Sequence, residues 1–134
     1  MLLRRKELLY QLLSVLCSDS YLPLDDEGRY PQIAKGVALL KQTYLENLPI
    51  DTFAKESSVS TSSFRALFKK QYGLSPLQYR NRLRINRARQ LLLEDGCSVS
   101  EAAYASGFDN IGYFCRYYKK ITGETPQQTK LRDL

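Results

Sequence analysis

The sequence contains no histidine and no tryptophan, and its three cysteines stand far apart at positions 17, 97 and 115. Zinc sites are built from closely spaced Cys and His side chains, so this pattern argues against one. The lack of histidine also removes the commonest general base and every Ser-His or Cys-His nucleophile. We therefore expect a protein that is not an enzyme and that holds no metal and no cofactor.

Long apolar runs are also lacking. None approaches the ~20 residues that a helix needs to cross a bilayer. The leucine-rich stretch that ends at Cys17 superficially resembles a lipoprotein signal, but Glu7, Tyr10 and Gln11 interrupt it and Leu16 is a poor neighbour for cleavage. We expect a cytoplasmic protein without a membrane partner.

Excess charge is confined to one part of the chain. The net charge is +6, yet residues 1–49 hold six Lys or Arg against six Asp or Glu, whereas residues 50–134 hold fourteen against eight. Localised positive charge is typical of a surface that binds a polyanion, either a nucleic acid or an anionic membrane.

That basic part of the chain contains an internal repeat. Residues 64–76 read FRALFKKQYGLSP and residues 114–126 read FCRYYKKITGETP. In each copy the first, fourth and fifth residues are large and apolar, so they share one face of a helix. Gly73 and Gly123 then end that helix, because only glycine adopts the left-handed conformation without a steric penalty. The hydroxyl residue and proline that follow begin another helix.

The repeat also extends towards the N-terminus, since residues 50–59 align with residues 99–108. One extra residue enters the second copy, at Asp109-Asn110, before Asn110 takes the cap position that Ser60 holds in the first. Each copy reads as a short helix, a polar turn and a second helix with an apolar inner face. This is the helix-turn-helix pattern, and we assign it to residues 50–72 and 99–122.

These patterns predict an all-α protein in which two helix-turn-helix subdomains are joined by a long linking helix over residues 76–94. A scaffold helix from Ile33 to about Leu48 comes before the first subdomain, and these elements form one domain over residues 32–134, which the helix-turn-helix motifs predict to bind DNA. An additional amphipathic helix is expected over residues 1–17, followed by a linker rich in turn formers over residues 18–31. The helix at 1–17 is either a dimerisation element, a remnant of a sensor domain, or a helix packed on its own domain.

The repeated motifs resemble the AraC family of bacterial transcription regulators. The resemblance covers about residues 33–130 and rests on Phe-Lys-Lys with Gly and Ser-Pro, Arg-Leu-Arg with Ala-Arg-Gln-Leu-Leu on the linking helix, and Ser-Gly-Phe before a second Lys-Lys, Gly and Thr-Pro. It implies two recognition helices that enter successive major grooves of duplex DNA, and contact with RNA polymerase. The sequence departs from the family pattern at Ala102, usually Ile, at Tyr118, usually Phe, and at Thr129-Lys130, usually Tyr-Arg.

Helical geometry selects the side chains that are expected to contact DNA. With Phe64 and Phe68 inward, the outer face of the first recognition helix presents Ser62, Arg65 and Ala66 to base edges. Arg65 is the strongest candidate because a guanidinium bonds both acceptors of guanine. The corresponding candidates of the second copy are Ile111, Gly112, Cys115 and Arg116. We expect the second helix to be less selective, and Cys115 to face the groove rather than to sense redox state.

Phosphate contacts are expected from the helix starts, from the repeated lysines and from the linking helix. The candidates are Ser60, Thr61, Ser63, Lys69, Lys70, Asn110, Lys119, Lys120, Arg80 and Arg82. The linking helix also carries Arg84, Arg87 and Arg89. Because these arginines point in several directions, we expect only one or two of them to touch DNA.

Three functions are compatible with these features. The first is a sequence-specific regulator of transcription that binds double-stranded DNA. The second is a nonspecific architectural nucleic-acid-binding protein. The two recognition helices carry different outward side chains, which binding by charge alone would not need, so this function is disfavoured. The third is a helical protein-interaction module, which leaves the localised charge unexplained. We expect the chain to be the C-terminal piece of a longer regulator with an effector domain, or else a stand-alone regulator that forms a homodimer.

Overall fold

The computed structural model describes residues 30–132, which form helices and no strand, so the predicted all-α class is confirmed. The helix predicted at residues 1–17, and all but the end of the linker at 18–31, lie outside the described residues. The elements are η2 (Pro31–Ile33), α2 (Ala34–Gln42), α3 (Ile50–Glu56), α4 (Thr61–Tyr72), α5 (Pro76–Glu94), α6 (Val99–Ala105), α7 (Ile111–Thr122) and α8 (Pro126–Leu131).

Local capping explains where most of these helices begin and end. Side-chain oxygens of Ser60 and Asn110 accept hydrogen bonds from backbone N–H groups in the first turns of α4 and α7. At the far ends of the same helices, Gly73 and Gly123 adopt left-handed conformations with φ of 71° and 84°. These caps satisfy backbone groups that would otherwise lack partners, so the sequence alone defines the ends of both helices.

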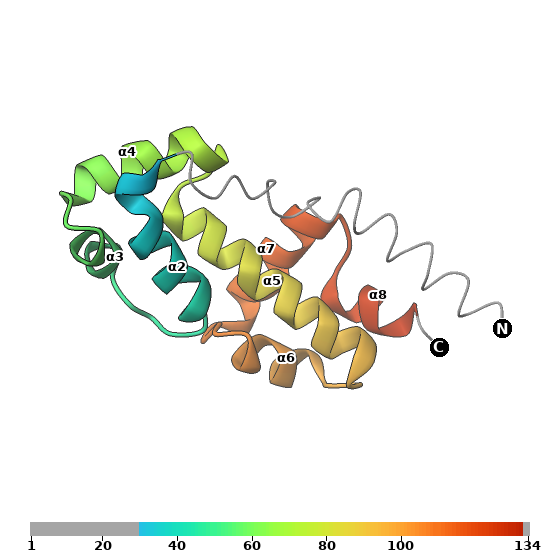
Figure 1. Ribbon diagram of the computed structural model, residues 1–134. Helices are drawn as coiled ribbons and strands as arrows, with labels where there is room; N and C mark the ends of the chain where they lie inside the picture. Colours follow the sequence, from blue (N-terminus) through green and yellow to red (C-terminus); the bar gives the residue numbers. More distant parts are fainter. Residues whose placement is uncertain (1–29, 133–134) are drawn as a thin grey trace, which may run out of the picture.

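Two units pack on opposite ends of α5 (Figure 1). The first unit comprises η2, α2, α3 and α4, and its core is centred on Phe53, Phe64 and Phe68. The second unit comprises α6, α7 and α8, with Phe114 and Tyr118 in its core. Residues of α5 contribute to both cores: Tyr79 belongs to the first and Ile85 to the second. A continuous helix of 19 residues, about 28 Å long at 1.5 Å per residue, therefore joins the two units.

The helix α2 ends earlier than expected. The apolar spacing predicted a helix to about Leu48, but α2 ends at Gln42. The hydroxyl of Thr43 donates to the carbonyl of Leu39 at 2.7 Å, and the backbone N–H of Thr43 bonds the same carbonyl at 2.9 Å. Residues 43–49 then form a loop, and three of its backbone carbonyls accept hydrogen bonds from arginines of α5.

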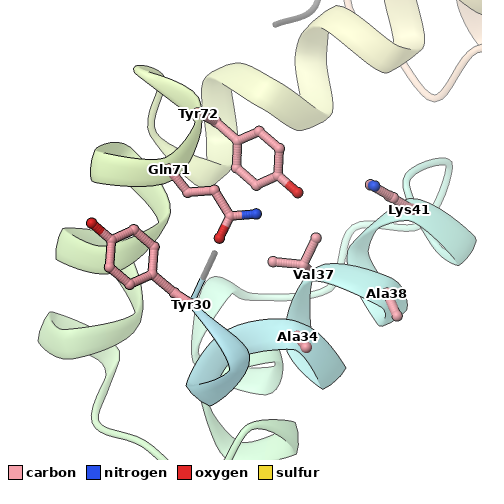
Figure 2. Close-up of a pocket in the computed structure, with 7 residues that line it drawn as sticks. All are labelled: Tyr30, Ala34, Val37, Ala38, Lys41, Gln71 and Tyr72. Carbon is pink, nitrogen blue, oxygen red and sulfur yellow. The ribbon is translucent and has the colours of Figure 1, made fainter. Parts of the chain in front are cut away.

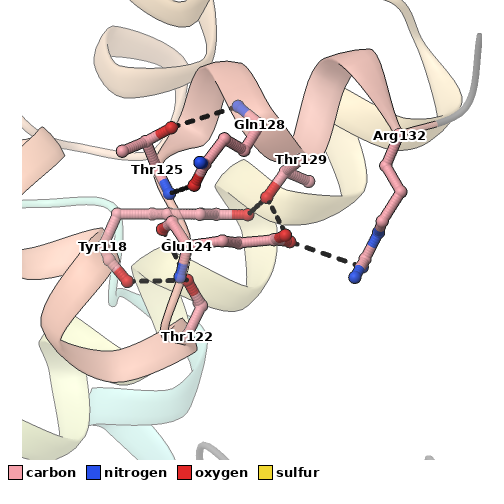
Figure 3. Close-up of polar contacts among 7 residues, drawn as sticks. All are labelled: Tyr118, Thr122, Glu124, Thr125, Gln128, Thr129 and Arg132. Atoms are coloured by element: carbon pink, nitrogen blue, oxygen red, sulfur yellow. Dashed lines mark hydrogen bonds and ion pairs between the residues drawn. The ribbon is translucent and has the colours of Figure 1, made fainter.

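Two departures from the family pattern lie in contact with each other. The hydroxyl oxygens of Tyr118 and Thr129 are 2.7 Å apart, and both side chains are fully buried (Figure 3). Thr129 donates its single proton to Glu124 Oε1 at 2.7 Å, so the proton between the two hydroxyls comes from Tyr118. Glu124 also pairs with Arg132 at 3.3 Å. The extra hydroxyl on α7 and the short side chain on α8 thus compensate one another.

This pairing predicts unequal costs for its two partners. Tyr118→Phe leaves Thr129 bonded to Glu124, so the free energy of unfolding should fall by only about 0.5–1.5 kcal/mol. Thr129→Val removes the hydroxyl that bonds both Tyr118 and Glu124 Oε1, so it should cost more, about 1–3 kcal/mol. Urea denaturation of both single variants and the double variant measures the coupling. If the two costs simply add, the two hydroxyls do not interact in solution.

Candidate nucleic-acid interface

The outer face of α4 presents the side chains that the repeat predicted. Ser62, Ser63, Arg65 and Ala66 are exposed, while Phe64 between them is fully buried. Phe64 and Phe68 pack ring against ring with centroids 5.8 Å apart, which fixes the rotation of the helix about its axis. Arg65 is therefore held on the side facing away from the core, near the N-terminal end of α4.

Hydroxyl groups at the start of α4 form hydrogen bonds within the protein. Ser60 Oγ accepts from the Ser63 N–H at 3.1 Å and donates to Ser63 Oγ at 2.9 Å. Thr61 Oγ1 donates to Asp51 at 2.8 Å. The Thr61 hydroxyl, together with Lys55 beside it, holds the pKa of the exposed Asp51 carboxyl below its ordinary value. Thr61 has one hydroxyl proton, so in this arrangement it can only accept a further hydrogen bond.

The second recognition helix, α7, presents a different surface. Gly112 and Arg116 are exposed, and a Cβ built on Gly112 would lie 3.5 Å from Arg116 Nη1. The guanidinium thus extends over the bare backbone of Gly112. Ile111 and Cys115 are only partly exposed and pack against the second core. Among the four base-reading candidates of α7, Gly112 and Arg116 are the more accessible to a ligand.

Tyr113, which the sequence prediction did not include, is a further candidate, because it is 44% exposed on α7. Its ring stacks on Tyr117, with centroids 5.8 Å apart and an angle of 24° between the ring planes. Tyr117 is half-buried, and burial raises the pKa of its hydroxyl above the ordinary value. Tyr113 occupies the place that Ser63 holds in the first copy, so the alignment of the two repeats contained the signal that would have found it.

Two lysines lie near the C-terminal end of each recognition helix. Lys69 and Lys70 lie in the last turn of α4, and Lys119 and Lys120 in the last turn of α7; all four are exposed. Positive charge at a helix C-terminus is favourable in itself, by about 0.3–1 kcal/mol. The position of these lysines therefore agrees with a phosphate contact and also with a purely local stabilising role.

Several arginines of α5 turn inward, including Arg80 and Arg82, for which the sequence predicted phosphate contacts. Arg80 is only 8% exposed and donates to the backbone carbonyl of Leu48, so the phosphate contact predicted for it is corrected. Arg82 is half-buried and bonds Tyr117. Arg84 is 5% exposed, and burial lowers the pKa of its guanidinium below the ordinary value. Apolar spacing did not reveal these roles because the carbonyl acceptors lie 23 to 40 residues away along the chain.

A cavity of about 160 Å³ lies in the first unit, away from the N-terminal half of α4 (Figure 2). Side chains of α2 and of the last turn of α4 line it, together with Tyr30: Ala34, Val37, Ala38, Lys41, Gln71 and Tyr72.

Within residues 30–132 no cluster of His, Cys, Asp and Glu could hold a metal ion. The same range contains no helix that is long and apolar enough to span a membrane.

Comparison with known proteins agrees with this architecture. A family described as "Helix-turn-helix domain" matches residues 53–132. The virulence regulon transcriptional activator VirF of Yersinia enterocolitica is 34% identical over 92 residues, which are 69% of this chain and 34% of VirF. The transcriptional activator RhaS of Escherichia coli is 28% identical over 125 residues, 93% of this chain and 45% of RhaS. The chain thus spans between a third and a half of the length of these relatives.

Solved structures show the same fold. An AraC-type regulator from Chromobacterium violaceum superposes with a TM-score of 0.72 at 31% identity, over 79% of this chain and 95% of that one. The DNA-binding domain of AdpA, solved in complex with a target DNA, gives a TM-score of 0.69 at 25% identity, over 75% and 91% of the two chains.

Two helix-turn-helix units on one linking helix define the architecture of this protein. Together with the family match, this arrangement shows that the chain belongs to the AraC family of transcription regulators, as its motifs predict. Its named relatives are transcription regulators and not enzymes.

Proposed function

We propose that this chain binds double-stranded DNA sequence-specifically, with α4 and α7 inserted into successive major grooves. The observation that carries the proposal is the matched construction of the two helices. Each has twelve residues, a polar side-chain cap at its start, a left-handed glycine at its end and two exposed lysines in its last turn. Both are borne by units that pack on one continuous helix, and the related AdpA domain was solved on a target DNA.

The exposed residues divide into two roles. Arg65 is the principal reader of base edges, flanked by Ser62 and Ala66, because a guanidinium in the major groove distinguishes guanine. On α7, Arg116 beside Gly112 takes this role, with the partly exposed Ile111 and Cys115 in apolar contact. Phosphate contacts come from the helix starts and the lysine pairs: Ser60, Thr61, Ser63, Asn110, Tyr113, Lys69, Lys70, Lys119 and Lys120. On binding, the hydroxyls of Ser60 and Thr61 turn from Ser63 and Asp51, to which they donate in the free protein, towards the phosphate.

In the cell this binding would place the protein at promoters in the cytoplasm, where contact with RNA polymerase would make it a regulator. The polymerase contact rests on membership of the family alone. A homodimer or an additional effector domain stays a prediction, since the chain spans only part of the length of its relatives.

Salt dependence of duplex binding tests the proposal against its alternatives. Four lysines, Lys69, Lys70, Lys119 and Lys120, each neutralise one phosphate, so the slope of log K against log salt should be about −3.6, at about 0.9 per neutralised phosphate. A preferred sequence should also bind at least ~10³ times more tightly than random duplex. Fluorescence anisotropy with both duplexes from 50 to 300 mM salt measures the two quantities. A steep slope with equal affinities would support an architectural protein, and the absence of duplex binding would support a protein-interaction module.

A further inference from the structure

Arg84 lies at the boundary between the two units. Its neighbour Leu83 packs against the core of the first unit, and its other neighbour, Ile85, is part of the core of the second. The two cores share no residue, so apolar packing holds each unit to α5 separately. Both units pack on the continuous helix α5, and a polar contact at this boundary would fix their relative position further.

The guanidinium of Arg84 hydrogen-bonds to both units. Its Nε donates to the carbonyl of Tyr44 at 2.6 Å, and its Nη2 donates to the carbonyl of Glu46 at 2.9 Å and to Asn47 Oδ1 at 3.0 Å. These three acceptors belong to the loop between α2 and α3 in the first unit. Its Nη1 donates to the carbonyl of Gly107, in the turn between α6 and α7 of the second unit, at 3.1 Å.

The turn at Gly107 closes directly against this guanidinium. Gly107 has a φ of 92°, and a Cβ built on it would lie 2.9 Å from Arg84 Nε and 3.2 Å from the carbonyl oxygen of Leu45. Glycine is therefore required both by the backbone conformation and by the space. The turn that leads into recognition helix α7 thus meets, through Arg84, the loop that leads into the first helix-turn-helix.

We propose that Arg84 is the positioning residue that sets the separation and relative rotation of α4 and α7, and hence the half-site spacing that the protein accepts. The proposal rests on the proposed function, since it assumes that both helices read DNA. The guanidinium of arginine is planar and carries five N–H donors, so it can hold several carbonyls in fixed directions. The ammonium group of lysine cannot do so. A lysine at this position would leave the contact between the two units looser.

Arg80 provides the matched control. It lies one helical turn before Arg84 on α5, it is also buried, and the bond that it makes to the carbonyl of Leu48 stays within the first unit. Arg80→Lys should destabilise that unit without loosening its position relative to the second. A purely structural role of Arg84 would make the two substitutions behave alike.

The first experiment measures affinity against spacing. The two half-sites are first obtained by selecting the protein on a random duplex library. Duplexes then carry these half-sites with the spacer lengthened or shortened by one and two base pairs, each step moving one site by about 3.4 Å along the axis. The unsubstituted protein should prefer one spacer about tenfold over its neighbours, and Arg84→Lys should reduce this preference to about threefold or less. Arg80→Lys should lower affinity equally at every spacer. An equal loss across all spacers for Arg84→Lys would overturn the proposal.

The second experiment needs no DNA and so separates this proposal from the proposed function. Residual dipolar couplings of the free 134-residue protein report whether the two units share one alignment tensor. They should share it in the unsubstituted protein and in Arg80→Lys, whereas in Arg84→Lys the two units should require different tensors. A common tensor in folded Arg84→Lys would refute the positioning role even if specific DNA binding is found. Different tensors in Arg84→Lys, without any spacer preference in the unsubstituted protein, would uphold the positioning role of Arg84 and refute the two-groove mechanism.

Discussion

Replacing Gly36 by alanine is expected to lower the free energy of unfolding by about 3 kcal/mol, the upper part of the range for overpacking a core. Gly36 lies in α2 where that helix crosses α3, and a Cβ there would lie 2.3 Å from the carbonyl oxygen of Phe53. The ring of Phe64 and the hydroxyl of Ser57 would both be 2.6 Å away. Because the first obstacle is backbone, the helices would have to separate.

Such a separation would also break the hydrogen bond from the Gly36 N–H to Ser57 Oγ, 2.8 Å long. Phe64 anchors recognition helix α4, so DNA binding through the first unit should weaken along with stability. Urea denaturation followed by circular dichroism measures the change. An unfolding free energy within 0.5 kcal/mol of the unsubstituted protein, roughly the range of innocuous substitutions, would contradict the close crossing of α2 and α3.

Gly112→Ala is the matched control, because the same methyl group is added at an open position of a helix. The nearest atoms to a Cβ at Gly112 are 3.4 and 3.5 Å away, which is ordinary contact. Alanine favours the helix by up to about 1 kcal/mol over glycine, so this variant should be more stable than the unsubstituted protein. Opposite signs for one chemical change would show that the cost at Gly36 comes from packing.

Replacing Arg65 by alanine is expected to reduce affinity for the preferred site by about 1–3 kcal/mol, the worth of one bidentate contact to guanine. Base preference should be lost at one position of the site and kept at the others. Lys69→Ala should instead weaken binding to all sequences alike and reduce the salt slope by about 1, because it removes a single phosphate contact. Binding to a panel of single-base variants of the site, at two salt concentrations, measures both effects.

Two controls separate charge from geometry in this experiment. Arg65→Lys keeps the positive charge but loses the planar fork, so it should lose base preference nearly as fully as Arg65→Ala. Arg87→Ala removes an exposed arginine of α5, outside both recognition helices, and should leave base preference intact. Uniform loss of affinity for all sequences in Arg65→Ala would show that Arg65 contacts the DNA backbone.

The parts of the fold that depend on neighbours in sequence were predictable. Caps at Ser60 and Asn110, and left-handed glycines at Gly73 and Gly123, act within one helical turn, so a repeat read from the sequence already contains them. The same repeat predicted that Arg65 and Arg116 point away from the cores. This succeeded because burial of one face of a helix determines the exposure of the other.

The parts that depend on distant partners were not predictable. The loop at residues 43–49 replaces the last turns expected of α2, and its carbonyls accept from Arg80 and Arg84, 32 to 40 residues later in the chain. From the sequence alone, an arginine in a helix is predicted to be exposed, because the distant carbonyls that accept its hydrogen bonds inside the fold are not known. Tyr118 and Thr129 likewise look like two separate departures from a family pattern until the structure brings their hydroxyls to 2.7 Å.

Selection of this chain on a random duplex library at about physiological salt, followed by sequencing, tests the central claim most directly. The two-groove account predicts two short conserved blocks whose centres lie about 10 base pairs apart, one helical turn of DNA. The block read by α4 should contain a strongly preferred guanine, and the block read by α7 should be the less selective. Retention of duplex without enrichment of any sequence, or enrichment of a single block, would contradict the account.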